Sequence, residues 1–121
     1  MDREPARSFE DLVVWKAHAF VLDVYRLTKG FPREETYGLT AQIRRSAVSI
    51  PANIAEGFRK RGRPDKARLM NVAEGSLEET RYYLRLANDL GYKTDATLVA
   101  KAAEIGKLLS AYSRTLLTPN S

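Results

Sequence analysis

The feature that most constrains this chain is a run of apolar residues spaced three and four apart between residues 39 and 57. This spacing places them on one face of a helix; they are Leu39, Ile43, Ala47, Ile50 and Ile54. Small residues surround that face, among them Ser46, Ser49, Ala52, Ala55 and Gly57. Because small side chains let neighbouring backbones approach closely, this helix is expected to pack on more than one side.

Pro51 interrupts this helical pattern. Proline lacks a backbone N–H, and its ring crowds the carbonyl four residues earlier, here that of Ala47. The pattern therefore predicts either a kink at Pro51 or a fresh helix start capped by Ser49. Asn53 follows within the apolar part of the helix, where a buried amide is expected to fix the register or to cap the kink.

Four helical segments can be read along the chain. They are expected at about residues 8–29, 39–60 and 64–90, with a last one that begins after a cap at Thr94 or Asp95 and runs to residue 117. Short turns between helices favour an all-α, up-down-up-down antiparallel four-helix bundle. A chain of 121 residues fits one domain. We expect that domain to span 8–117, with flexible segments at 1–7 and 118–121.

The first helix carries more apolar surface than one bundle core requires. A second apolar stripe lies beside its core stripe and consists of Leu12, Trp15, Ala19 and Leu22. The helix is therefore either deeply central or partly covered by another subunit. In the connection that follows, Phe31 and Tyr37 are expected to pin the chain to the bundle. Gly75, in the middle of the third helix, is expected to allow a close helix crossing.

Several classes of site are excluded or disfavoured. The chain has no cysteine, no apolar leader-like segment and no apolar run of membrane-spanning length, which together predict a cytoplasmic protein without a membrane partner. Its single histidine, His18, follows Trp15 by three residues, so the Glu-x-x-His pairs of di-iron bundles are absent. The carboxylates Glu56, Glu74, Glu78 and Glu79 are expected to form ion pairs with Arg44, Arg45 or Arg81. We therefore expect no catalytic, cofactor or metal site, and no enzyme.

The excess positive charge is concentrated in one segment. Residues 59–68 hold six basic residues and one acidic residue, a balance of +5 that equals the net charge of the whole chain. Such a concentration sets up a local field that attracts polyanions. A solvated turn between helix ends is the alternative interpretation. The predicted nucleic-acid-binding residues are Arg59, Lys60, Arg61, Arg63, Lys66 and Arg68, with Arg44 and Arg45 as further contributors.

Residues 8–117 also carry a resemblance. The run F-P-R-E-E-T-Y-G-L-T-A-Q-I-R-R-S-A-V-S-I-P-A-N-I-A-E-G, followed by A-E-G-S-L-E-E-T and L-G-Y, resembles the four-helix bundle proteins of 23S rRNA intervening sequences. That family is similar to the accessory variability determinant of diversity-generating retroelements. The resemblance implies a ring-shaped homopentamer of left-handed bundles and, for the retroelement relatives, a basic surface that engages nucleic acid and a reverse transcriptase. Residues 59–64 depart from the glycine- and serine-rich turn of the family, which indicates either a stronger nucleic-acid surface or a variable loop.

Two functional hypotheses follow. The first is a non-enzymatic oligomeric scaffold that binds RNA or DNA through its basic surface, largely without regard to sequence. The second is a protein–protein adaptor with no direct nucleic-acid binding, whose partner is a reverse transcriptase or another protein. Affinity for nucleic acid that falls steeply with salt distinguishes the first from the second.

Overall fold

The computed structural model describes residues 8–117, which contain four α-helices, one short 3-10 helix and no strand. The elements are α1 (Phe9–Thr28), η1 (Arg33–Glu35), α2 (Leu39–Arg59), α3 (Arg63–Asp89) and α4 (Ala96–Leu117). The predicted all-α class and the four helices are confirmed. The segments 1–7 and 118–121, which the sequence predicts to be flexible, lie outside the described residues. Among the described helices, none has the length and apolar character needed to cross a membrane.

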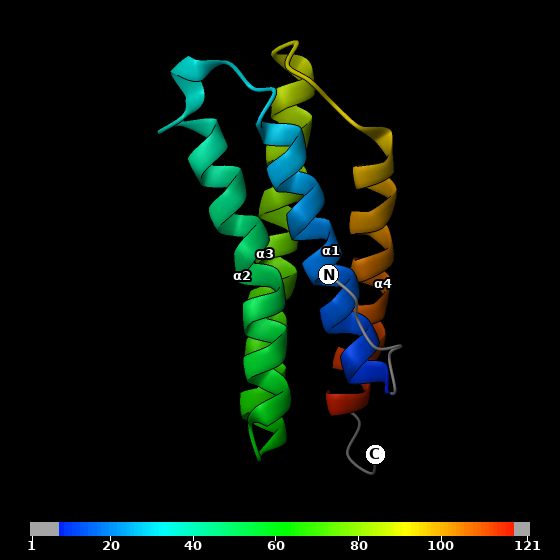
Figure 1. Ribbon diagram of the computed structural model, residues 1–121. Coiled ribbons are helices and arrows are strands. Elements are labelled where there is room, and N and C mark those ends of the chain that lie inside the picture. The colour runs from blue at the N-terminus through cyan, green and yellow to red at the C-terminus, as the bar shows by residue number, and fades with distance from the viewer. Residues whose placement is uncertain (1–7, 118–121) are drawn as a thin grey trace.

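Consecutive helices run in opposite directions and form a bundle (Figure 1). Helix α1 packs against α2 and α4, and α3 packs against the same two helices from the other side. The most extensive contact joins α2 to α3, and the least extensive joins α1 to α4. The ion pairs Lys16–Glu104 and Asp23–Lys101 reinforce this last contact at the surface. As predicted, α2 packs on more than one side.

The core is formed by one stripe from each helix. On α1 the buried stripe includes Val13, Ala17, Phe20 and Val24, and α2 contributes the predicted apolar face in full. The second stripe of α1 stays outside the core of this chain, because Leu12, Trp15 and Ala19 are only half-buried and Leu22 is 40% exposed. Helix α1 is therefore not deeply central, which leaves cover by another subunit as the remaining interpretation of its surplus apolar surface.

Helices α2 and α3 approach each other closely along a seam of small residues. A Cβ atom added to Gly57 would overlap the terminal methyl of the buried Met70 and lie 3.2 Å from the Cβ of Leu69. Further along the seam, the hydroxyls of Ser46 and Thr80 lie 2.7 Å apart in the core. Polar groups buried in this way need partners: one of these hydroxyls donates to the other, and Ser46 and Thr80 also lie within hydrogen-bond distance of the carbonyl oxygens of Ile43 and Ser76, respectively.

Helix α2 continues through Pro51 without a break, so the predicted alternative of a fresh helix start is wrong. Its axis changes direction about halfway along, as expected of a proline kink (Figure 1). Asn53 donates to the carbonyl oxygen of Ser49 at 2.8 Å and to the Ser49 hydroxyl at 2.9 Å. The same hydroxyl accepts from Ser76 of α3 at 2.8 Å. The predicted amide at the kink thus belongs to a hydrogen-bonded bridge between α2 and α3.

One end of the bundle is held by Glu35, which ends η1 in the connection between α1 and α2. Its carboxylate accepts from the Leu39 backbone N–H at 3.0 Å and from the Tyr92 hydroxyl at 2.8 Å. The Tyr92 ring packs on Phe31, which is buried as predicted. Gly91 adopts φ +80 and lets the chain turn from α3 toward Tyr92. These contacts join the two connections at this end.

Tyr37 does not pin the first connection, so that prediction is wrong. Its side chain is 95% exposed, although the backbone around it is hydrogen-bonded. At this end the ring of Phe31 packs on Tyr92, whereas the ring of Tyr37 projects into solvent.

The close crossing expected at Gly75 is also absent from this chain, because a Cβ at that position meets nothing within 4 Å. Gly57 and Gly75 therefore form a matched pair of helical glycines, one buried in the α2–α3 seam and the other on the open surface of α3. Only the first is required by packing.

Alanine substitutions at these two glycines should have opposite effects. Gly75→Ala should raise the free energy of unfolding by about 1 kcal/mol, the usual gain in helix propensity. Gly57→Ala gains the same propensity but forces Met70 to move, at an overpacking cost of about 1–3 kcal/mol, so its net effect should be destabilising. Urea unfolding at a fixed protein concentration measures both. Stabilisation by both variants would contradict the close approach at Gly57.

Acid should weaken the contacts of Glu35. The Leu39 N–H and the Tyr92 hydroxyl hold the pKa of Glu35 below its ordinary carboxyl value. A lowered folded-state pKa contributes stability at pH values above the unfolded pKa of about 4.3, and this contribution is lost as the pH falls through the folded pKa. Glu35→Gln should therefore melt below the wild type at pH 7, and the difference should shrink toward pH 3. A difference in melting temperature that stays constant with pH would contradict this role.

Candidate nucleic-acid interface

The turn between α2 and α3 gathers basic residues because both helices end close to it in sequence. Helix α2 ends at Arg59 and α3 begins at Arg63, so the connection is three residues long. Gly62 occupies the N-cap position of α3, and Pro64 follows in the first helical turn, where its missing N–H has no intrahelical acceptor to lose. The sharp reversal keeps the basic side chains at one end of the bundle. We call Arg59, Lys60, Arg61 and Arg63 the basic turn.

The basic turn is exposed and largely uncompensated. Arg59, Arg61 and Arg63 are exposed and Lys60 is half-buried. The side chains of Arg59, Lys60 and Arg61 make no hydrogen bond or ion pair with any residue from 8 to 117. Like charges placed close together repel, and no carboxylate of the described chain forms an ion pair with Arg59, Lys60 or Arg61. The arrangement favours an anion supplied from outside.

Two of the other predicted basic residues have local roles. Lys66 donates from Nζ to the carbonyl oxygen of Phe58 at 2.9 Å, and so caps the C-terminal end of α2. Arg68 lies 3.9 Å from Asp65 in an exposed pair one helical turn apart, which contributes little to stability. Lys66 is thus part of the fold, whereas Arg68 borders the basic turn without holding it in place.

An aromatic cluster closes the core beneath the basic turn. The Tyr112 ring lies 5.2 Å from Phe58, edge to face, and 5.8 Å from Phe9. Burial, with the negative charge of Glu10, raises the pKa of Tyr112. Because Phe58 is occupied in this cluster, it offers no free face for stacking on a base. The cluster also means that the core does not depend on the cations above it.

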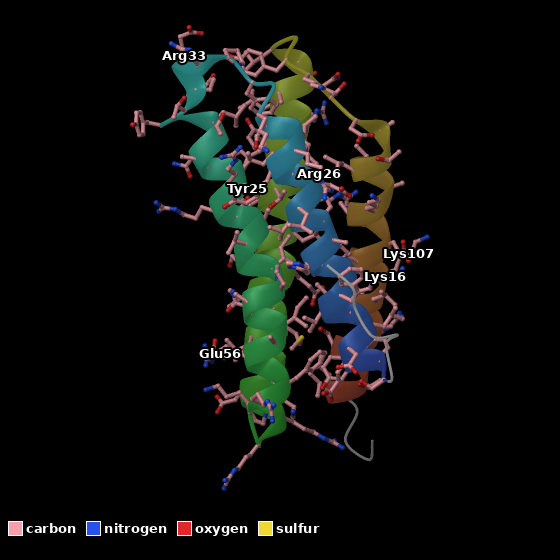
Figure 2. All side chains as sticks on the ribbon, in the orientation of Figure 1. Lys16, Tyr25, Arg26, Arg33, Glu56 and Lys107 are labelled. Carbon is pink, nitrogen blue, oxygen red and sulfur yellow. The ribbon has the colours of Figure 1, made fainter. Side chains whose placement is uncertain are left out.

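Arg44 lies near the other end of α2 and is held inside the chain. Its guanidinium donates to Thr28 Oγ1 at 2.7 Å and to the Tyr25 carbonyl oxygen at 3.3 Å, and it lies 4.5 Å from the centre of the Tyr25 ring. Tyr25 projects from α1 toward α2 (Figure 2). Arg44 therefore satisfies the C-terminal carbonyls of α1 and ties this helix to α2, so little of its charge is available to a partner.

Arg45 is exposed and has no side-chain partner in the described part of the chain. It precedes Arg59 by 14 residues, which corresponds to about 21 Å and nearly four helical turns. The structure therefore does not bring Arg45 into the basic turn, but it places both arginines on the same side of α2.

Of the four carboxylates expected to form ion pairs, only Glu78 pairs with one of the expected arginines among residues 8–117, and Glu56 has no side-chain partner there. Glu78 pairs with Arg81 at 3.0 Å as expected, while Glu74 accepts from Ser113 of α4 at 2.9 Å. Glu79 accepts from the Tyr83 hydroxyl at 2.7 Å. Within residues 8–117, no three His, Asp or Glu side chains are grouped so as to hold a metal.

His18 is half-buried beside Trp15, with the two ring centres 6.0 Å apart. It lies on the outward side of α1, next to the second apolar stripe. His18 is therefore a surface residue of α1 rather than part of the core.

Comparison with known proteins gives the chain a family. The family described as 23S rRNA-intervening sequence protein matches residues 10–111, which include parts or all of each of the four helices. The chain belongs to this family. The resemblance carried by the first connection and α2 is thereby confirmed. The retroelement relationship stays a prediction.

A solved structure supports the family assignment. It comes from Bacteroides thetaiotaomicron and is described as a protein with unknown function from the S23 ribosomal protein family. Its sequence is 29% identical to that of this chain. The match covers 88% of this chain and 99% of the solved one, and the TM-score is 0.78. No curated protein matches the chain.

Proposed function

We propose that this protein is a non-enzymatic, oligomeric scaffold of the cytoplasm that binds RNA or DNA through its basic turn. The observation that carries the proposal is the set Arg59, Lys60 and Arg61, three cations that adjoin one another without an internal counter-ion among the described residues. Cations of this kind bind phosphates and release the counter-ions condensed on a nucleic acid. Family membership is consistent with the proposal through the rRNA context of the family's name.

The expected mode of binding is backbone recognition. Arginine and lysine contacts to phosphate position a nucleic acid but read no sequence. The basic turn contains no aromatic side chain, and the nearest one, Phe58, is packed on Tyr112. We therefore propose largely sequence-independent binding to the phosphate backbone of a duplex or a structured RNA.

Assembly of several copies accounts for the apolar stripe on α1. Leu12, Trp15, Ala19 and Leu22 face away from the core of this chain, and exposed apolar surface of this kind marks contacts with other molecules. A ring with cyclic symmetry needs a second, different patch on the next subunit. We place it at the groove of about 620 Å³ between α3 and α4, where Tyr82 and Val99 are more than half exposed.

A ring, which we expect to be a homopentamer, would repeat the basic turn in every subunit. Weak phosphate contacts in several subunits act together when one polyanion reaches more than one of them, so the affinity of the assembly exceeds that of a single copy.

A protein–protein adaptor is the alternative function. It is favoured by exposed apolar side chains outside the α1 stripe, such as Val72 and Leu90 on α3, which are 41% and 50% exposed. In that case a reverse transcriptase or another protein is the partner, and nucleic acid should not bind near physiological salt.

Removal of the basic turn should weaken nucleic-acid binding without harm to the fold. The triple variant Arg59→Ser, Lys60→Ser, Arg61→Ser keeps Lys66, which caps α2. Its affinity for a structured RNA should fall, and the slope of log K against log salt should shrink by about 2–3 if all three side chains contact phosphates. Fluorescence anisotropy across a salt series measures both.

A matched control removes the same amount of charge elsewhere. Lys29→Ser, Arg33→Ser, Lys107→Ser alters three exposed cations of the first connection and α4. This control should leave the salt slope nearly unchanged, and both triple variants should melt close to the wild type. Equal losses in the two triple variants would show a general effect of net charge and would remove the basic turn from the proposal.

The α1 stripe should control the size of the assembly. Light scattering of the wild type should give a multiple of the 13.6 kDa chain mass. Leu22→Glu places a charge in the proposed contact and should shift the mass toward that of one chain. Val48→Glu is a matched control, because Val48 of α2 is 42% exposed against 40% for Leu22. A wild type that scatters only as a single chain would end the proposal of a ring.

A further inference from the structure

Tyr37 is the most exposed large side chain among the apolar and aromatic residues of the described chain, at 95%. Its backbone is nevertheless well supported. The Gly38 N–H donates to the Glu35 carbonyl oxygen at 3.0 Å, and the Thr36 hydroxyl donates to the Arg33 carbonyl oxygen at 2.7 Å. Glu35 itself is held by Leu39 and Tyr92. An exposed aromatic ring on a hydrogen-bonded stretch of backbone adds nothing to the core. It is pre-positioned for contact with another molecule.

The ring lies at the start of a continuous strip on the outward side of α2. Tyr37 precedes α2 by two residues, and from Ala41 the strip follows steps of three and four residues along the helix. Its members are exposed except for the half-buried Ala41, and we call them the α2 strip: Tyr37, Ala41, Arg45, Val48, Ala52, Glu56 and Arg59. The strip ends at Arg59, where the basic turn begins.

The α2 strip carries two arginines and one carboxylate, so its net charge is positive. Arg45 and Arg59 have no side-chain partner in residues 8–117, and the positions between them on the strip are Val48, Ala52 and Glu56. Glu56 projects from the outer side of α2 (Figure 2). Two unpaired arginines favour an anionic occupant over an apolar helix of a second copy, because burial of an unpaired charge is costly.

The dimensions of the strip fit a nucleic-acid duplex. The 21 residues of α2 span about 30 Å, which equals the rise of about nine base pairs at 3.4 Å each. A duplex of this length seated along α2 would bring phosphates to Arg45 and Arg59 and would leave the ring of Tyr37 beyond its end. An aromatic face in that position stacks on a base that is not already stacked in a helix.

We infer that the α2 strip is a track for a nucleic-acid duplex with a single-stranded end, and that an unpaired base of this end stacks on Tyr37. The inference rests on the proposed function, because it extends the basic turn along α2 to a second contact. It names the substrate as a junction between duplex and single strand.

The test compares two probes that differ only at the end. A 12-base-pair duplex is prepared blunt and with a three-nucleotide single-stranded extension, in RNA and in DNA, and fluorescence anisotropy measures the affinity of the full chain. The wild type should prefer the extended probe by roughly five- to 100-fold, the usual effect of one stacked base. The comparison of RNA with DNA identifies which nucleic acid is preferred.

Variants at two positions isolate the two contacts. Tyr37→Ala should abolish the preference for the extension and leave affinity for the blunt duplex unchanged, whereas Tyr37→Phe should retain the preference because stacking does not need the hydroxyl. Val72→Ala trims a side chain of α3 that is 41% exposed and lies outside the proposed contacts, and it should change neither value. Arg45→Ser should reduce the salt slope by about 0.7–0.9 for both probes.

The outcomes separate this inference from the proposed function. Binding of the blunt duplex with no preference for the extension, or a preference that survives Tyr37→Ala, overturns the role of Tyr37 and leaves the basic turn intact. Failure of both probes to bind overturns the inference together with the proposed function. A smaller assembly mass for Tyr37→Ala or Arg45→Ser, with the fold unchanged by circular dichroism, shows that the strip is an interface between copies and overturns the inference.

Discussion

A methyl group cannot be added to Gly57 without displacing Met70, and this closeness of α2 to α3 sets the geometry of the bundle. Side chains as small as serine and glycine line the seam, so the two backbones approach further than leucine or isoleucine would allow. The hydroxyl pairs Ser46–Thr80 and Ser49–Ser76 then form at specific levels along the seam. Apolar contacts tolerate sliding, whereas hydrogen bonds in a buried seam form only in one register. Helices α1 and α4 pack on the pair that results.

The same geometry divides the basic residues into two groups. Lys66 and Arg44 satisfy backbone carbonyls at helix ends, where cations complement the partial negative charge. The side chains of Arg45, Arg59 and Arg61 bind no backbone carbonyl, and the core does not require them to be exposed. Because aromatic rings seal the core below the turn, the charges there are free to vary without a structural cost. Their concentration is therefore informative about function in a way that the total charge of the chain is not.

Much of the fold could be predicted from the sequence because the signals were local. Apolar periodicity located the four helices, and glycine and proline marked their ends. Local signals could not predict which of two similar residues in one segment or helix type packs on a neighbouring element. Phe31 and Tyr37 occupy the same connection, but only Phe31 is buried against the core. Gly57 and Gly75 are both helical, yet only one faces a neighbouring helix. The predicted interface was similarly divided, because adjacent positions on α2 point in different directions: Arg44 faces α1, and Arg45 faces solvent.

The even number of helices has a practical consequence for work on this protein. The first residues of α1 and the last residues of α4 lie at the same end as the basic turn, as the contact of Phe9 and Phe58 with Tyr112 demonstrates. An affinity tag or fluorescent domain fused at either side of residues 9–117 would therefore crowd the charged end and add its own charge there. A circularly permuted chain, opened between Tyr92 and Asp95 and joined across residues 9 and 117, would move the attachment point to the opposite end of the bundle. Labels and surface tethers placed there would leave the charged end unobstructed.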